Sequence, residues 1–276
     1  MSLTLVLLLL ALGIATSQAC SNQRSITLRW LRLGDLIGLS LLCIAGVAML
    51  IDPPMAGGRA LGILGGLLTA GTLAHLMLVQ SGRRVSQRWV MAATVVLAAA
   101  GLIAPWVAST LSPHRVLEVE ALPSAASAPA AWTEPLIGVS LALAAWLTGG
   151  SLMTMLLGHA YLTSGSEMTQ RPFRRLVALL LIGLLLRLLI AGVGGLWPWW
   201  RNGAEAEGAR AFAGLMIAAR FLMGLVVPLG MTWMALQCVR LRSNQSATGI
   251  LYVSSTMILV GEFLGLSLIA SHRLPF

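Results

Sequence analysis

Charged side chains are scarce in this chain. Only 10% of its 276 residues are Asp, Glu, Lys or Arg, against about a quarter in a typical soluble domain. A soluble protein needs that charge to cover its surface, so water is excluded as the main solvent. Lysine is missing altogether, because all 18 basic residues are arginine, and this bias favours no particular function.

Cysteine is also rare, and its placement excludes further chemistry. Cys20, Cys43 and Cys238 lie far apart and form neither a CxxC pair nor a metal-ligand spacing, so neither a disulfide framework nor a thiol relay is indicated. The sequence contains no P-loop, zinc motif, nucleophile elbow or pair of catalytic carboxylates. Its loops are too short for a soluble active-site domain, so we do not expect a self-contained hydrolase or ATPase.

Long apolar runs make up most of the chain instead. Hydrophobic residues account for 58% of it and the mean hydropathy is +0.88. A helix of about 20 apolar residues crosses about 30 Å of hydrocarbon. We therefore predict an all-α polytopic membrane bundle, a single domain over residues 1–276 with the lipid bilayer around it and an irregular external loop at 111–135. About eight transmembrane helices are expected, at residues 3–19, 33–51, 60–79, 88–110, 136–162, 174–196, 211–238 and 248–270.

The arginines alternate between the connections of these helices. The first, third, fifth and seventh connections are basic, with Arg24, Arg29, Arg32; Arg83, Arg84, Arg88; Arg171, Arg174, Arg175; and Arg240, Arg242. The even connections hold Asp52, Glu118, Glu120, Glu134, Glu205 and Glu207. The positive-inside rule then places both termini outside. Arginines that follow the first apolar run favour a retained helix over a signal peptide, and the net charge of +9 reflects topology, with no nucleic acid as partner.

Three charged residues fall deep inside apolar runs. Arg187, Arg220 and Glu262 lie on three different predicted helices, all about 16–21 Å above the cytoplasmic boundary. Buried ions are costly unless they pair, so we predict that the three side chains meet with Glu262 ionised between the arginines. The surplus positive charge favours a quinone carbonyl, a haem propionate, a lipid head group or a transported anion as ligand. A structural ion pair that locks three helices together is the alternative.

Two histidines form a second candidate site. His75 and His159 each precede a cytoplasmic loop by four or five residues, on predicted helices that run in the same direction. Facing histidines hold haem iron in membrane bundles, so the pair is a candidate for two axial ligands of haem b. The alternative is that each histidine only hydrogen bonds to a backbone carbonyl or to a neighbour such as Tyr161.

Polar residues also mark the start of the eighth predicted helix. Gln245, Ser246 and Thr248 lie where the last basic loop enters that helix. A helix N-terminus attracts a phosphate or a quinone oxygen, and Gln245 is therefore a candidate ligand-binding residue. Capping of the helix by Ser246 or Thr248 is the alternative.

Two short strings carry a resemblance to a known group. Gly158–Thr163 reads GHAYLT, and Gln245–Tyr252 reads QSATGILY and is followed by Gly261 and Glu262. These strings resemble motifs of an uncharacterised family of bacterial polytopic inner-membrane proteins, over roughly the last four predicted helices. In plan the chain is also loosely similar to the quinol-interacting membrane subunits of the NrfD and polysulfide reductase type, whose motifs do not align with it. The resemblance implies a bacterial inner membrane and no particular activity.

These features together lead to one functional hypothesis with two alternatives. We expect a membrane subunit of a bacterial electron-transfer or respiratory assembly, which binds quinone or haem b and associates with other membrane subunits. The first alternative is a scaffold or assembly subunit whose polar residues only specify helix packing. The second is a transporter of a small solute or anion, built around the Arg187, Arg220 and Glu262 layer.

Overall fold

The structure is a computed structural model that describes residues 3–21, 26–51, 58–111, 133–163, 169–196, 199–200 and 207–276. The predicted external loop at 111–135 lies outside these ranges except at its two ends. There Leu111 closes one helix and Thr133 begins the next.

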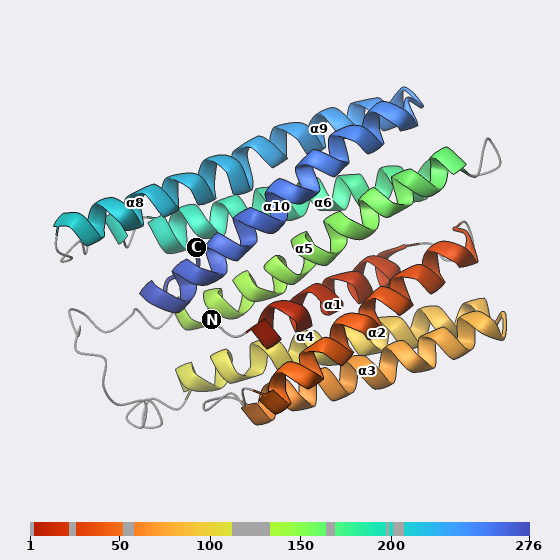
Figure 1. Ribbon diagram of the computed structural model, residues 1–276, viewed down its shortest axis with the longest axis horizontal. Coiled ribbons are helices and arrows are strands. Elements are labelled where there is room, and N and C mark those ends of the chain that lie inside the picture. The colour runs from red at the N-terminus through yellow and green to blue at the C-terminus, as the bar shows by residue number, and fades with distance from the viewer. Residues whose placement is uncertain are drawn as a thin grey trace.

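The described residues are almost entirely helical (Figure 1). The elements are α1 (Leu3–Cys20), α2 (Leu28–Ile51), α3 (Gly58–Gln80), α4 (Arg84–Leu111), α5 (Thr133–Thr163), α6 (Arg171–Ile190), η3 (Ala191–Leu196), α8 (Glu207–Phe221), η4 (Leu222–Val226), α9 (Val227–Arg240) and α10 (Asn244–His272). The π-helical segment η3 continues α6, and η4 joins α8 to α9. Eight spans long and apolar enough to cross a membrane result within the described ranges, which confirms the all-α, multi-pass membrane fold.

Several helices begin earlier than their apolar runs predict. α2 begins at Leu28 rather than at residue 33, and α10 begins at Asn244 rather than at residue 248. The added residues include Arg29 and Arg32 at the start of α2, and Asn244, Gln245 and Ser246 at the start of α10. Their backbone groups extend the helical hydrogen-bond ladder past the hydrocarbon, where hydropathy alone gives no signal.

The helices form two four-helix rings that lie side by side. In the first ring, α1 packs on α2, α2 on α3, α3 on α4 and α4 on α1. In the second, α5 packs on α6, α6 on α9, α9 on α10 and α10 on α5. Figure 1 shows the first ring below and the second above, joined where α5 lies against α1 and α4.

The joint between the rings is a crossing of two glycines. A Cβ atom on Gly13 of α1 would lie 2.9 Å from the Cα atom of Gly149 on α5, and 2.8 Å from the carbonyl carbon of Ala145. Any larger side chain would push the helices apart. Because membrane helices gain most of their association energy from close packing, this contact explains why α1 and α5 pack so extensively.

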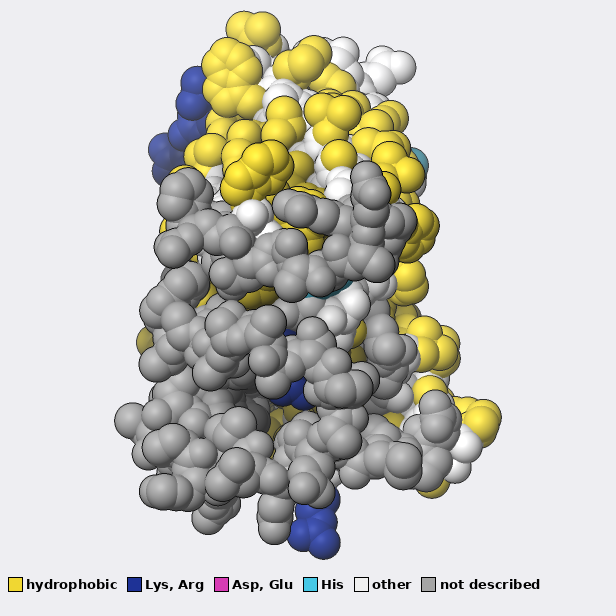
Figure 2. Space-filling view, turned by 90° about the vertical axis from the view of Figure 1, so that its left-hand side faces the viewer, with side chains coloured by type: hydrophobic (Ala, Val, Ile, Leu, Met, Phe, Trp, Pro, Cys, Tyr) yellow, Lys and Arg dark blue, Asp and Glu magenta, His cyan; other side chains and the backbone are white. Residues whose placement is uncertain are grey.

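The outer surface of the bundle is apolar. Leu36, Leu50, Val96 and Phe212 are among the large hydrophobic side chains that are more than half exposed. Figure 2 looks onto the end of the bundle at which both termini lie, and shows hydrophobic side chains gathered at the top of the view. A surface of this kind is stable only against lipid, so the bilayer is the partner of these faces.

The two ends of the bundle differ in charge. Both termini lie at the left-hand end of Figure 1. The ends of α1, α3, α5 and α9 that precede the basic connections lie at the opposite end, which we call the arginine-rich end; it carries Arg29, Arg32, Arg83, Arg171 and Arg242 among others. The assignment of this end to the cytoplasm stays a prediction.

Candidate functional site

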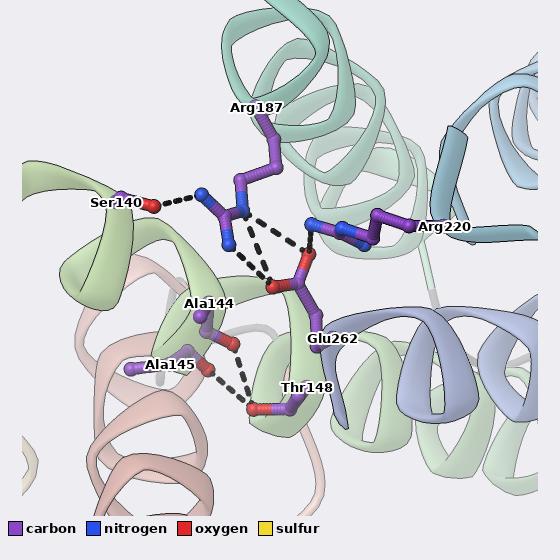
Figure 3. A network of polar contacts seen from close by, with 7 residues as sticks. All are labelled: Ser140, Ala144, Ala145, Thr148, Arg187, Arg220 and Glu262. Atoms are coloured by element: carbon purple, nitrogen blue, oxygen red, sulfur yellow. Dashed lines mark hydrogen bonds and ion pairs between the residues drawn. The ribbon is translucent and has the colours of Figure 1, made fainter. Parts of the chain in front are cut away.

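The three deep charged residues meet inside the second ring. Arg187 lies in the last turn of α6, Arg220 near the end of α8, and Glu262 on α10. Figure 3 shows the two guanidinium groups converging on the carboxylate from different helices, with Ser140 of α5 beside Arg187. All four side chains are completely buried. The predicted meeting of Arg187, Arg220 and Glu262 is confirmed, and Ser140 joins a group that we call the arginine–glutamate cluster.

Glu262 accepts hydrogen bonds from both arginines. Arg187 Nη2 donates to Oε2 at 3.0 Å, and Arg187 Nε contacts Oε1 at 3.3 Å and Oε2 at 3.2 Å. Arg220 Nη2 donates to Oε1 at 2.7 Å. Every contact to the carboxyl group is an N–H donor, and an ionised carboxylate is the form that only accepts. The arrangement therefore suits an ionised Glu262 and leaves one positive charge in excess.

The two arginines differ in how many of their nitrogen atoms have hydrogen-bond partners. Arg187 also donates from Nη1 to the Ser140 hydroxyl, so all three of its nitrogen atoms have partners. Arg220 has a single partner, Glu262, and its Nε and Nη1 atoms are buried with no hydrogen-bond partner among the described residues. A buried donor without a partner costs about 1–3 kcal/mol or more. Arg220 therefore carries donor capacity that the protein itself does not satisfy.

Two glycines of α10 make room for Arg220. A Cβ atom on Gly265 would lie 2.8 Å from Arg220 Nε, and one on Gly261 would lie 3.2 Å from Nη1. Gly261 and Gly265 stand four residues apart, one on each side of Glu262 in sequence, and so share one face of the helix. The guanidinium group lies over this small-residue face, which brings its Nη2 atom to the carboxylate.

Each arginine stands next to a π-helical segment. η4 begins two residues after Arg220, and η3 begins four residues after Arg187. A π-turn inserts an extra residue into the helix and turns the following side chains relative to the preceding ones; such turns occur frequently at functional sites. η4 also ends immediately before Val227 and Pro228. There the local change in hydrogen bonding accommodates the N–H group that proline lacks.

An apolar cavity of about 160 Å³ reaches Glu262 from the side of the bundle. Its wall is built from α1, α5 and α10, and the residues that line it are Val6, Leu9, Leu10, Ala144, Thr148, Leu259, Glu262, Phe263 and Leu266. The Thr148 hydroxyl donates to the carbonyl of Ala144 at 2.8 Å. Glu262 is thus the charged group of an otherwise apolar wall.

Apolar side chains close the cluster off from the end where the termini lie. Phe276 is completely buried and packs with Ile217 of α8 and Leu268 of α10. Ile217 lies about one turn beyond Arg220, and Leu268 lies about two turns beyond Glu262, both toward that end. Water from that end meets this hydrophobic layer first. Among the described residues, a cavity between α1, α5 and α10 reaches the cluster.

The structure does not bring the two histidines together. His75 is completely buried on α3, where its Nδ1 atom lies 2.8 Å from Oδ1 and 2.9 Å from Oδ2 of Asp35. His159 is exposed on α5, and α3 and α5 are not among the helix pairs that pack extensively within the described residues. The haem b prediction stays untested, and His75 and His159 do not face each other. Tyr161 donates to the carbonyl of Thr169 at 2.6 Å.

The start of α10 differs from the prediction. Gln245 is exposed in the first turn at the arginine-rich end, far along α10 from Glu262. The predicted cap by Ser246 or Thr248 is wrong, because the helix begins at Asn244 and Ser243 occupies the cap position. The Ser243 hydroxyl donates to Ser246 Oγ at 3.0 Å, and Thr248 donates back to the carbonyl of Asn244 at 2.7 Å.

The two strings behind the family resemblance contact each other. A Cβ atom on Gly158 would lie 2.7 Å from Thr248 Oγ1 and 3.0 Å from the ring of Phe173. Phe173 in turn stacks on Tyr161 with 5.3 Å between ring centroids. These positions form a tight junction of α5, α6 and α10, so their observed role is in packing.

Asp35 and Gln87 were not among the predicted site residues. Both are completely buried, Asp35 on α2 and Gln87 on α4. Asp35 stood near the start of a predicted span, next to the basic loop, where a charge is ordinary. The available signal was its sign, because an acid is unexpected at an arginine-rich boundary.

Comparisons with known proteins add no identification. No protein-family model matches the chain, and no curated protein or solved structure matches it either. Within the described residues, no group of three or more His, Cys, Asp or Glu side chains is placed to hold a metal ion. The features that bear on function are therefore the arginine–glutamate cluster and its cavity.

Proposed function

We propose that this chain is a quinone-binding membrane subunit of a bacterial electron-transfer assembly in the inner membrane. The observation that carries the proposal is the apolar cavity that reaches the arginine–glutamate cluster from the side of the bundle. A quinone combines an apolar ring and tail with two oxygen atoms that accept hydrogen bonds. These two parts correspond to the apolar wall and to the positively charged cluster.

The position of the cavity favours a ligand that arrives through the lipid. Phe263 and Leu259 form part of its wall and are 56% and 37% exposed on the flank of the bundle. The hydrophobic layer around Phe276 separates the cluster from the aqueous end. A water-soluble anion would have to cross apolar surface on either route, whereas a quinone is already dissolved in the bilayer.

The size of the cavity favours a single ring over a macrocycle. A cavity of about 150 Å³ lined by apolar side chains is known to hold one benzene molecule, and the cavity here measures about 160 Å³. Sites for larger cofactors are typically 300–1,000 Å³. One quinone ring matches this volume, and its isoprenoid tail would extend past Phe263 into lipid.

Glu262 is the cluster residue in the cavity wall, and both arginines bind its carboxylate. Arg220 retains Nε and Nη1 without partners in the described residues, and the cluster carries one excess positive charge. Both features favour a carbonyl or a reduced, partly anionic oxygen over a neutral hydrocarbon. Since a bound quinone exchanges electrons only with a second redox group, the proposal includes a partner subunit that holds that group.

A pair of matched substitutions tests this proposal. Leu259 lines the cavity, while the adjacent Val260 is 51% exposed and does not line it. Leu259→Trp should fill the cavity, and Val260→Trp should place the same ring against lipid. We expect purified wild-type protein to release quinone on solvent extraction and to bind decylubiquinone or a short-chain menaquinone saturably. Leu259→Trp should weaken that binding about tenfold or more, which corresponds to about 1.4 kcal/mol, and Val260→Trp should leave it unchanged.

Two results would overturn the proposal. One is wild-type protein that releases no quinone and shows no saturable binding of either compound. The other is equal binding by the Leu259→Trp and Val260→Trp variants, which would mean that the quinone sits elsewhere. Circular dichroism and a monodisperse elution profile in detergent establish that each variant is folded before binding is measured.

A scaffold subunit is the second candidate, and one observation favours it. Both carboxylate oxygens of Glu262 are already occupied by arginine donors, so the cluster can lock α6, α8 and α10 together without a ligand. A scaffold predicts that Glu262→Gln destabilises the fold and that no quinone copurifies. The extraction experiment separates the two candidates.

A further inference from the structure

A second buried polar network lies in the first ring, near the arginine-rich end. Asp35 of α2 and His75 of α3 share a hydrogen bond of 2.8 Å between Oδ1 and Nδ1. The Gln18 side chain of α1 hydrogen bonds with Asp35, and its Nε2 atom donates to the carbonyl of Leu31 at 2.8 Å. All three polar side chains are completely buried. Counted along their helices, Asp35 and His75 lie about 8–11 Å from the arginine-rich end.

The close fit around Gln18 shows that this network is built into the helix packing. A Cβ atom on Gly34 would lie 3.2 Å from the side-chain carbonyl carbon of Gln18 and would clash with its Nε2 atom. A residue other than glycine beside Asp35 would therefore displace Gln18. The network joins α1, α2 and α3 at one level, far from the cluster on α6, α8 and α10.

The fourth helix of the ring adds Gln87. Gly71 of α3 directly contacts Thr94 of α4. Because the two helices are antiparallel, His75 lies level with Met91. Gln87 lies one turn nearer the arginine-rich end. Gln87, Met91 and Thr94 share the buried face of α4. Both amide atoms of Gln87 are buried without a hydrogen-bond partner in the described part of the chain. An amide in this state requires water or another polar group.

The charge balance of the pair depends on one proton. With a carboxylate and an imidazolium, or with a carboxylic acid and a neutral imidazole, the pair is neutral overall. If one proton leaves, a carboxylate and a neutral imidazole remain, and a net negative charge is buried in the membrane layer. Loss or gain of that proton therefore changes the charge of the ring interior by one unit.

We propose that Asp35 and His75 form a proton-binding site that exchanges one proton with the aqueous phase at the arginine-rich end. On release, the N–H or O–H bond of the pair breaks and the proton passes to water; on uptake, the reverse occurs. Gln87, one turn nearer that end on α4, holds the water through which the proton moves. This inference is independent of quinone binding, because it concerns the first ring.

Few other titratable or charged groups surround the pair in the described residues. On α2 itself, Arg29 and Arg32 are exposed, and on α4 Arg88 is exposed. Neither α1 nor α3 presents a second carboxylate or imidazole beside the pair; Cys20 is the titratable group of α1. His159 on α5 is exposed. A change in the protonation of His75 is thus attributable to Asp35 and to bulk pH.

The test is nuclear magnetic resonance of the full chain labelled with ¹⁵N-histidine in detergent. The chain has four histidines, and ring nitrogen shifts distinguish neutral from protonated imidazole at each one. Spectra are recorded as bulk pH is varied between about 5 and 9, and we expect the His75 shifts to change. Asp35→Asn should abolish that change, because the imidazolium loses its counter-ion. His159→Gln, a substitution at an exposed site, should leave the His75 shifts as they are.

Spectra of the His75→Gln variant identify which resonances belong to His75. The pH series itself is measured on the wild-type chain, so a poorly folded variant does not decide the outcome. His75 shifts that stay constant across this pH range would overturn the proposal and leave a structural link between α2 and α3. A titration of His75 that persists unchanged in Asp35→Asn would also overturn it, since the proton would then not be shared. A Gln87→Leu variant should slow exchange between the two His75 states, and exchange at the wild-type rate would remove Gln87 from the route.

Discussion

Gly224 of η4 and Gly261 of α10 touch backbone to backbone. A Cβ atom on Gly224 would lie 2.6 Å from the Cα atom of Gly261 and 3.0 Å from Arg220 Nη1. This contact brings the backbone of α8 and η4 close to α10. The Arg220 side chain can therefore reach the Glu262 carboxylate. The ion pair in the interior of the second ring therefore depends on two residues that carry no side chain.

A methyl group at this crossing should destabilise the protein. Gly261→Ala would force the two backbones apart, and overpacking of this kind costs about 1–3 kcal/mol. Gly230→Ala is the matched control, because Gly230 lies in the same span as Gly224 with nothing within 4 Å of its Cβ position. Thermal unfolding in detergent should show a clear loss for Gly261→Ala and a change within about 1 kcal/mol for Gly230→Ala. Equal melting temperatures would contradict the close contact.

Removal of the Glu262 charge should be costly, and removal of one arginine should recover part of the loss. Glu262→Gln leaves two buried cations without a counter-ion, which costs about 3–5 kcal/mol. Adding Arg187→Met takes away one of these cations, so the double variant should be more stable than Glu262→Gln alone. A double-mutant cycle of unfolding free energies measures this coupling. Additive losses, with no recovery, would mean that the two side chains do not interact.

Two exposed arginines allow a matched test of topology. Arg242 and Arg273 both have positive φ angles, 59° and 51°, and they lie at opposite ends of α10. In a chain carrying Cys20→Ser, Cys43→Ser and Cys238→Ser, we expect Arg273→Cys to react with an impermeant maleimide in intact cells. Arg242→Cys should react only after the membrane is opened, because basic connections stay in the cytoplasm. The reverse labelling pattern would invert the predicted orientation.

The two strings behind the family resemblance each contain a glycine, and the two should respond differently to substitution. Gly158 has Thr248 and Phe173 within 3.0 Å of its Cβ position, whereas Gly249 has nothing within 4 Å. Gly158→Ala should lower the free energy of unfolding by about 1 kcal/mol or more, since Phe173 sits in a packed core. Gly249→Ala should be near neutral or slightly stabilising in the helix. Detergent unfolding of both variants side by side is the measurement, and a larger effect at Gly249 would refute this assignment.

The sequence by itself determined the eight spans, because hydrocarbon thickness and backbone hydrogen bonding leave a long apolar chain few alternatives. It also determined that Arg187, Arg220 and Glu262 would meet. A lone charge at that depth is too costly, and the chain offers one carboxylate at the level of two cations. The helix ends were less accurate, since polar residues beyond the hydrocarbon continue the helices without an apolar signal.

The tertiary structure alone decided which face of each helix points inward. Membrane helices are apolar on all sides, so a periodic pattern does not separate the lipid-facing side from the buried side. His159 is exposed and His75 is buried against Asp35 for this reason, although both stand at similar depths in the sequence. The sequence also contains no sign of the π-turns near Arg187 and Arg220 or of the glycine contacts beneath Arg220. These follow from close packing between helices distant in sequence, which sets the rotation of each helix and thus the place of every polar group.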